Sequence, residues 1–292
     1  MATHPQLEFL DQPTLNRPHL VIAWAGFNDA GESATHAARS LLASLQADAF
    51  AIIDAEEYYD FTEARPYARY EDGERDIVWP TTDFYAARTG SEHDLVIALG
   101  IEPNYRWKSY MSAIAEVITA TKIEMIYTLG AVAAQVPHTR PIAVRGSANM
   151  PELAERFNMH PSRFEGPTGI VGVFHHFCRG LNHPALSLWA SVPHYLPGVT
   201  NPMGARALLE KLEELTGITL SYDQLARDYE RFEHQVGLAV QENDELRSYV
   251  QQLEESVGAT PESGEAAASE LPPADTLIEQ LEDFLRDHRS ED

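Results

Sequence analysis

The chain has 292 residues, of which 44% are hydrophobic, so it is long enough for one large domain with an appendage. Its formal net charge of −24 makes a surface that repels nucleic acids and anionic membranes, and we expect neither as a partner. The only cysteine, Cys178, excludes a disulfide within the chain. Because there is also no signal-peptide pattern and no apolar run of about 18 residues, we expect a soluble cytoplasmic protein.

Strand patterns alternate with helix patterns over residues 1–200. Apolar runs that end at glycines or polar turns predict strands at residues 20–25, 50–54, 95–99, 125–129, 142–144, 170–173 and 186–192. Helices are expected at residues 32–45 and, with Asn104 as N-cap, at residues 104–120. This alternation is typical of a mainly parallel sheet covered on both faces, so residues 1–200 form the predicted α/β core domain.

A β-hairpin is predicted within this core, at residues 67–79. Glu71-Asp72-Gly73 lies between two runs that are rich in aromatic and branched residues, and Asp-Gly at that place is a hairpin signal. The hairpin interrupts the α/β order, so we expect it to project from the core and to contact another subunit.

The C-terminal part is predicted to be helical over residues 201–257. Asn201 as N-cap, Pro202 and Gly217 bound a first helix, and a capping box of Ser221 with Gln224 begins a long helix that ends near residue 257. Its apolar residues repeat every seven positions: Leu225, Phe232, Ala239, Leu246 and Leu253. The stripe has two interpretations, a coiled coil between chains or packing on its own domain as a lid over the strand ends. Residues 258–274 read as a flexible acidic linker, and residues 275–292 as a short terminal helix and tail.

Several loops that follow predicted strands carry polar or special residues. Because the carboxyl ends of parallel strands meet at one edge of a sheet, we expect these loops to line one ligand-binding cleft. The candidate residues are Gly26, Phe27, Asn28, Asp29, Gly31, Gly100, Glu102, His138, Thr139 and Arg140. Asp29 or Glu102 could act as acid or base, and Arg140 could bind an anion. The alternative is structural: Asn28 or Asp29 caps the next helix, and Glu102 pairs with Arg140.

The sequence predicts no metal ion and no other cofactor. It has no His-Glu-x-x-His or Cys-x-x-Cys spacing, and the adjacent His175 and His176 would point about 100° apart on a helix. The loop at residues 26–31 matches neither a phosphate loop nor a dinucleotide-binding pattern, and no Gly-x-Ser-x-Gly occurs. No catalytic residues are therefore assigned.

An ordered set of motifs between about residues 18 and 255 resembles the proteasome assembly chaperone 2 family, in its actinobacterial branch. The motifs are Gly26-Phe27-x-Asp29-x-Gly31, Asp60-Phe61 with Arg65-Pro66, Gly100-x-Glu102-Pro103 with Trp107, Leu129-Gly130-Ala131, residues 136–141 (Val-Pro-His-Thr-Arg-Pro), residues 166–170 (Gly-Pro-Thr-Gly-Ile) and residues 192–195 (Val-Pro-His-Tyr). The resemblance implies a three-layer α/β/α sandwich, like that of nucleoside phosphorylases and peptidyl-tRNA hydrolases. It also implies a helical C-terminal appendage near the pocket, and homo-oligomers.

The resemblance favours a non-enzymatic, oligomeric assembly or scaffold protein, with a trimer favoured over a dimer and a proteasome-related partner. Members of the wider family help assemble proteasomes, often through a hydrophobic-Tyr-x tail, whereas this chain ends with the residues Arg-Asp-His-Arg-Ser-Glu-Asp. The alternative function is a hydrolase or phosphorylase that acts on a small anionic or nucleoside-like substrate. An enzyme needs the candidate residues to converge around a concave pocket, whereas a scaffold needs only an exposed surface for its partner.

Overall fold

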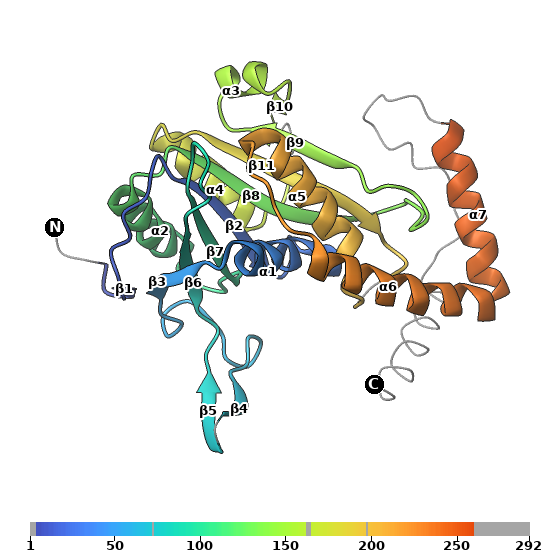
Figure 1. The fold of residues 1–292 in the computed structure, drawn as a ribbon, viewed down its shortest axis with the longest axis horizontal. Coiled ribbons are helices and arrows are strands. Elements are labelled where there is room, and N and C mark those ends of the chain that lie inside the picture. The colour runs from blue at the N-terminus through green and yellow to red at the C-terminus, as the bar shows by residue number, and fades with distance from the viewer. Residues whose placement is uncertain (1–3, 72, 162–164, 197, 260–292) are drawn as a thin grey trace.

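The computed structural model describes residues 4–71, 73–161, 165–196 and 198–259. Within these residues a nine-stranded sheet (Figure 1) has the strand order β1-β3-β6-β7-β2-β8-β11-β9-β10. The strands are β1 (Leu7–Phe9), β2 (His19–Ala25), β3 (Asp48–Ile53), β6 (Thr82–Ala87), β7 (Leu95–Ile101), β8 (Met125–Ala134), β9 (Val144–Ala148), β10 (His160–Pro161) and β11 (Ala185–Pro193). The central neighbours β7, β2, β8 and β11 are parallel, and antiparallel pairs flank them on both sides.

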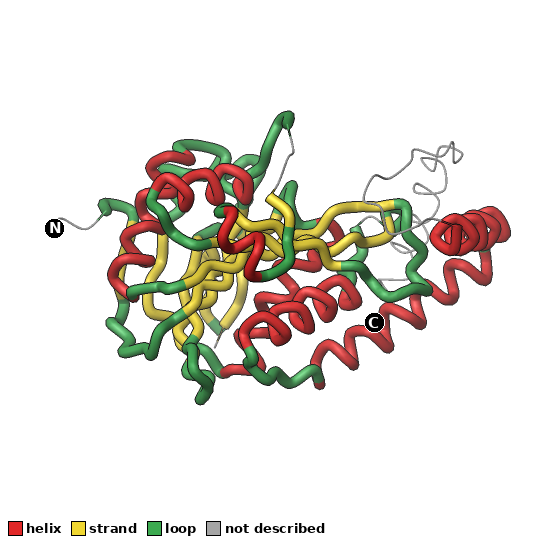
Figure 2. The backbone as a smooth tube through the Cα atoms, turned by 90° about the horizontal axis from the view of Figure 1, so that it is seen from above, coloured by secondary structure: helices red, strands yellow, loops and turns green. Residues whose placement is uncertain are grey.

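Helices cover both faces of this sheet (Figure 2), which confirms the predicted three-layer α/β/α sandwich. The helices of the sandwich are α1 (Ser33–Leu45), α2 (Trp107–Thr121), α4 (Ile170–Gly180) and α5 (Pro202–Thr216). Alternate residues of β2 face opposite cores, as the period of two in a strand requires. Val21 and Ala23 pack with α1 and α5, whereas Leu20 and Ile22 pack with α2 and α4.

Three predicted elements of the α/β core differ from the structure. Residues 170–173, predicted as a strand, begin α4, because a short apolar run does not distinguish a strand from a buried helix. The strand predicted at residues 142–144 begins only at Val144 and continues to Ala148. The helix predicted from Asn104 begins at Trp107, because the amide of Asn104 instead bonds the backbone N–H of Asp60 and the carboxylate of Glu63. The strands β1, β6 and β10 and the short helix α3 (Pro151–Arg156) were not predicted.

The predicted hairpin is present and projects from the body of the protein (Figure 1). Its strands β4 (Tyr67–Glu71) and β5 (Glu74–Val78) pair only with each other within the described residues. Every residue of β4 is exposed, and so is every residue of β5 except Val78. At the base of the hairpin, Trp79 makes an edge-to-face contact with Phe61 at 5.0 Å between ring centroids.

The first C-terminal helix, α5, begins and ends as the sequence predicts. The side chain of Asn201 accepts a hydrogen bond from the backbone N–H of Gly204 at 3.0 Å, and Pro202 occupies the first helical position. Gly217 follows the helix with φ of 70°, in the left-handed region that glycine adopts readily.

The single long helix predicted for residues 221–257 is wrong, because the chain breaks at Asn243 into α6 (Asp223–Glu242) and α7 (Asp244–Ala259). Asn243 is extended, with φ of −122° and ψ of 105°. Its side-chain oxygen accepts hydrogen bonds from the backbone N–H groups of Glu245 and Leu246, both at 3.0 Å. Asparagine is a strong N-cap and a weak helix former, so it ends one helix and begins the next. The capping box at Ser221 is also not formed, since Tyr222 occupies the N-cap of α6.

The apolar stripe on these helices is buried against the same chain. Leu225 joins the core beside α1 and α5. Phe232, Ala239, Leu246 and Leu253 form a third apolar cluster with Tyr195 and its neighbours after β11. Of the two interpretations of the stripe, the structure therefore shows packing on its own chain. Residues 260–292, which include most of the predicted linker and the predicted terminal helix, lie outside the described residues. None of the helices in the described part of the chain has the length and apolarity that a membrane crossing requires.

Candidate functional site

The loops after β2 and β7 meet the beginning of α4 through Glu102. The Oε1 atom of Glu102 accepts a hydrogen bond from the backbone N–H of Ile170 at 2.6 Å and a longer one from the side-chain amide of Asn28 at 3.4 Å. Gly26, with φ of 121°, lies so close that an added Cβ would be 3.3 Å from that of Glu102. Three predicted site residues, Gly26, Asn28 and Glu102, are thus brought together, and the carboxylate of Glu102 fixes the start of α4.

Asp29 is a buried helix cap, as the structural alternative proposed. Its carboxylate accepts hydrogen bonds from the backbone N–H of Ala34 at 2.6 Å and from the hydroxyl of Thr35 at 2.5 Å. Burial raises the pKa of Asp29, while these hydrogen bonds act in the opposite direction. Gly31 has φ of 59°, and its carbonyl accepts the backbone N–H of Asn201 at 2.7 Å, so this turn also positions the start of α5.

The first turns of α1 and α4 are therefore both occupied by carboxylates of the chain itself. The N-terminus of a helix attracts anions, because its N–H groups are unpaired and its dipole is positive there. In this protein Asp29 fills that position on α1, and Glu102 fills it on α4. A phosphate or another small anion would have to displace a bound carboxylate at either helix.

A second group forms where the loops after β8 and β11 meet α7. We call His138, His194, Tyr195 and Tyr249 the His–Tyr cluster; the ring centroids of its contacting pairs are 5.7–6.0 Å apart. The hydroxyl oxygen of buried Tyr195 accepts the backbone N–H of His138 at 2.8 Å and lies 2.7 Å from Nδ1 of the same residue. When Nδ1 carries no proton, the hydroxyl of Tyr195 donates its own proton to it. Burial lowers the pKa of His138, which keeps its ring neutral and able to accept this bond.

The His–Tyr cluster attaches α7 to the strand ends. Nδ1 of His194 lies 3.1 Å from the carbonyl oxygen of Ala134 and must donate to it, so Nε2 is free to accept from the hydroxyl of Tyr249 at 3.0 Å. Thr139 donates a hydrogen bond from its hydroxyl to Glu254 on the same helix. The sequence predicted His138 and Thr139 but missed Tyr249 and Glu254. The two loops share the dipeptide Pro-His, at residues 137–138 and 193–194, and this repeat was the sequence feature that linked them.

The remaining predicted residues take separate positions. Gly100 packs against Thr82, where an added Cβ would lie 2.3 Å from the hydroxyl oxygen. Phe27 is 79% exposed, and Arg140 is also exposed. Among the described residues no ion pair joins Arg140 to Glu102, so that part of the structural alternative is not found. A cavity in the described part of the chain is lined by other residues, at the edge of the sheet: Phe9, Asp11, Gln12, Pro13, Phe50, Ala120 and Thr121. The cleft shared by all the candidate residues stays a prediction.

The fold and these contacts define a three-layer α/β protein whose C-terminal helices pack over the strand ends. The model of the PAC2 family matches residues 23–240, and the chain belongs to this family. This confirms the resemblance that the motifs indicated.

Solved structures agree with that assignment. A PAC2 family protein from Streptomyces avermitilis MA is 38% identical, with 80% of this chain and 99% of that chain covered and a TM-score of 0.74. The Mycobacterium tuberculosis proteasome-assembly chaperone homologue Rv2125 is also 38% identical, with coverage of 79% and 99% and a TM-score of 0.70. The archaeal proteasome activator PbaB from Pyrococcus furiosus, at 14% identity, coverage of 79% and 96% and a TM-score of 0.66, shares the fold. No curated protein matches the sequence.

Proposed function

We propose that this protein is an oligomeric scaffold that takes part in the assembly of proteasomes, and that it is not an enzyme. Its membership of the PAC2 family supports the proposal, as does its 38% identity to a protein that bears the name of a proteasome-assembly chaperone homologue. Two structural features also support the proposal. One is the rim of the sheet, where an enzyme would need its reactive groups, and the other is the hairpin of β4 and β5, which projects from the sandwich.

The polar residues at the rim of the sheet hold the fold together, which supports a structural role for them. A general acid or base has to reach a substrate, yet Asp29 and Glu102 each accept hydrogen bonds from the first turn of a helix. Nδ1 of His138 is hydrogen-bonded to the hydroxyl of Tyr195, whose ring in turn contacts Tyr249 on α7. These contacts disfavour the hydrolase or phosphorylase alternative, because an anionic substrate would compete with carboxylates already held in the chain.

The observation that carries the proposal is the hairpin of β4 and β5. A two-stranded hairpin is marginally stable alone in water, and this one has no described neighbour along its length. It exposes Tyr67, Ile77 and Tyr70, of which Tyr70 is 76% exposed. Large apolar side chains on two unpaired edges are the features of a contact surface. We propose that the hairpin joins copies of this chain, with a trimer favoured over a dimer, and that the oligomer is the scaffold.

Light scattering on the purified chain tests this assembly. The double variant Tyr67→Ser and Tyr70→Ser removes two exposed aromatic rings without touching the core, so the measured mass should fall from that of the oligomer to that of a single chain. Leu181→Ser is the matched control, because Leu181 is an exposed apolar residue at the end of α4, and it should leave the mass unchanged. An oligomer that persists in the double variant would count against the hairpin as the joining surface.

Binding to proteasome subunits tests the partner. Purified α- and β-subunits from the same organism should co-elute with the wild-type chain in size-exclusion chromatography, and mass spectrometry of the complex should identify no small molecule held in stoichiometric amount. A nucleoside or a small anion retained by the chain, with no subunit bound, would favour the enzymatic alternative instead.

A further inference from the structure

A cluster of His19, His93 and Glu124 lies at the opposite rim of the sheet from the residues discussed so far. His19 is the first residue of β2, His93 precedes β7, and Glu124 directly precedes β8. Because β7, β2 and β8 are parallel neighbours, their amino-terminal ends bring these residues together. One possible ligand atom from each residue lies within 4.8 Å of those of the other two.

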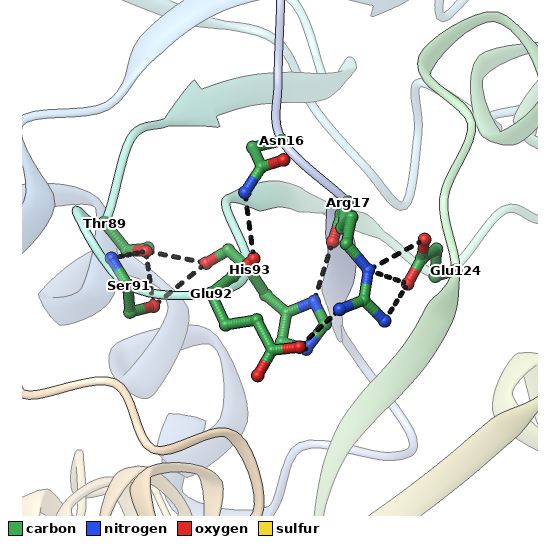
Figure 3. Close-up of polar contacts among 7 residues, drawn as sticks. All are labelled: Asn16, Arg17, Thr89, Ser91, Glu92, His93 and Glu124. Carbon is green, nitrogen blue, oxygen red and sulfur yellow. Dashed lines mark hydrogen bonds and ion pairs between the residues drawn. The ribbon is translucent and has the colours of Figure 1, made fainter.

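A hydrogen bond sets His93 in the tautomer that a metal ligand needs. Its Nδ1 lies 3.0 Å from the carbonyl oxygen of Arg17 (Figure 3) and must donate a hydrogen bond to it, so Nε2 carries the free lone pair. Histidines that bind metals commonly donate their second ring N–H to a carbonyl or a carboxylate in this way. The side chain is 16% exposed, so the ring is packed but can still be reached from solvent.

His19 independently points to a bound ion, because one of its ring nitrogens is buried and unpaired. The residue is only 7% exposed, and its Nδ1 is buried without a hydrogen-bond partner. Buried polar atoms without partners are rare in folded proteins, and each one calls for an explanation such as an ion. The ring of His19 stacks on that of His93, with 3.9 Å between the centroids and 22° between the planes. The unpaired nitrogen therefore belongs to a ring that touches another ligand candidate.

We propose that His19, His93 and Glu124 bind a divalent transition-metal ion of the zinc class. Two imidazoles and one carboxylate form a common three-residue zinc set, which leaves a fourth position for water or a ligand. Zinc–nitrogen bonds are about 2.0–2.1 Å long, so the ligand atoms have to approach one another and the stacked rings have to turn apart. The exposed carboxylate of Glu124 and the partly exposed ring of His93 can make this adjustment around the buried His19.

Arg17 is the cation that competes for this site. Its guanidinium holds Glu124 through Nε, at 3.2 and 3.1 Å from the two carboxylate oxygens, and also pairs with Glu92 (Figure 3). The side chain of Arg17 is half exposed, so it can leave Glu124 and keep its second partner. A metal ion and Arg17 would thus exchange on one carboxylate. This relation makes an unusual prediction, that loss of a basic residue strengthens the binding of a cation.

Calorimetric titration of the untagged, chelator-treated chain with zinc chloride tests the site. We expect one strongly bound ion per chain, and binding at least about tenfold weaker in each of His93→Gln and Glu124→Gln. These positions are chosen because neither is fully buried, so the variants should fold, which melting in the presence of EDTA will check. His176→Gln is the matched control, since His176 is an exposed histidine on α4, and it should bind zinc like the wild type.

The competition with Arg17 supplies a readout that adventitious binding would not give. Arg17→Met should tighten zinc binding several-fold, because it removes a positive charge beside Glu124 and leaves the ligands in place. Cobalt(II) bound in the same place should give the intense visible bands of a four-coordinate ion, and His93→Gln should abolish them. Zinc binding that is absent, or equally strong in the double variant of His93 and Glu124, would overturn the proposal.

Discussion

Replacing Leu246 with alanine measures how firmly α7 is packed on the rest of the chain. Leu246 is 1% exposed and belongs to the apolar cluster that joins α6 and α7 to Tyr195 and Leu196 after β11. Alanine is the better helix former, so the substitution does not weaken α7 itself. Any loss of stability must therefore come from the contacts between α7 and its neighbours.

The expected loss follows from the atoms that are removed. Three buried carbon atoms at about 0.8 kcal/mol each correspond to about 2.4 kcal/mol of transfer free energy. The cavity that remains adds to this, so the free energy of unfolding should fall by about 2–5 kcal/mol. Leu238→Ala is the matched control: Leu238 is 38% exposed on α6, and its truncation should cost only about 0.5 kcal/mol.

Urea unfolding followed by circular dichroism gives both free energies, and hydrogen exchange of the α7 amides locates the loss. We expect faster exchange along α7 in Leu246→Ala and little change in Leu238→Ala. If the Leu246 variant were as stable as the Leu238 variant, with wild-type exchange in α7, the reasoning from burial would be refuted and α7 would have to be a loosely attached arm.

Two further predictions concern Asn243 and His175. Asn243→Ala should cost about 1 kcal/mol of stability, because the N-cap of α7 is lost, and α7 should become more sensitive to limited proteolysis. Asn243→Asp keeps the capping oxygen and should behave like the wild type; equal proteolysis of all three chains would contradict the capping role. Burial lowers the pKa of His175 from 6.5 to about 4. Between these two pH values the unfolded chain binds the proton and the folded chain does not. The stability that neutral His175 contributes is therefore complete above pH 6.5 and is lost as the pH falls toward 4. This one group changes the free energy of unfolding by at most about 1.4 kcal/mol per pH unit. Urea unfolding at a series of pH values should therefore show a weaker pH dependence of that free energy in His175→Gln than in the wild type. An unchanged pH dependence would contradict the lowered pKa of His175.

Elements whose ends depend on nearby residues could be predicted from the sequence. Asn201, Pro202 and Gly217 bound α5 through contacts within a few positions, and the structure shows the expected cap and left-handed residue. The hairpin likewise follows from a local Asp-Gly signal between two short runs. The break at Asn243 was local as well, but the regular apolar stripe on both sides favoured a continuous helix. The chain nevertheless begins a new helix at this point, because the side-chain oxygen of Asn243 caps α7.

Roles that depend on distant residues could not be predicted. The cap that Glu102 places on α4 joins it to Ile170, which lies 68 positions further along the chain, and no motif spans such a separation. The same holds for His19 and His93, which become neighbours only through the order of β7 and β2 in the sheet. Asp29 was easier, because the N–H groups that it caps lie only five and six positions away.

The position of β2 in the sheet also governs how the chain has to fold as it is made. β2 is synthesised well before its hydrogen-bonding neighbours β7 and β8. Until then its run of buried apolar residues has two open edges, and such edges are templates for pairing between chains. Fragments that stop before β8 should therefore aggregate. The other edge of β8 is covered only by β11, so nearly the whole α/β core must leave the ribosome before the central strands are protected.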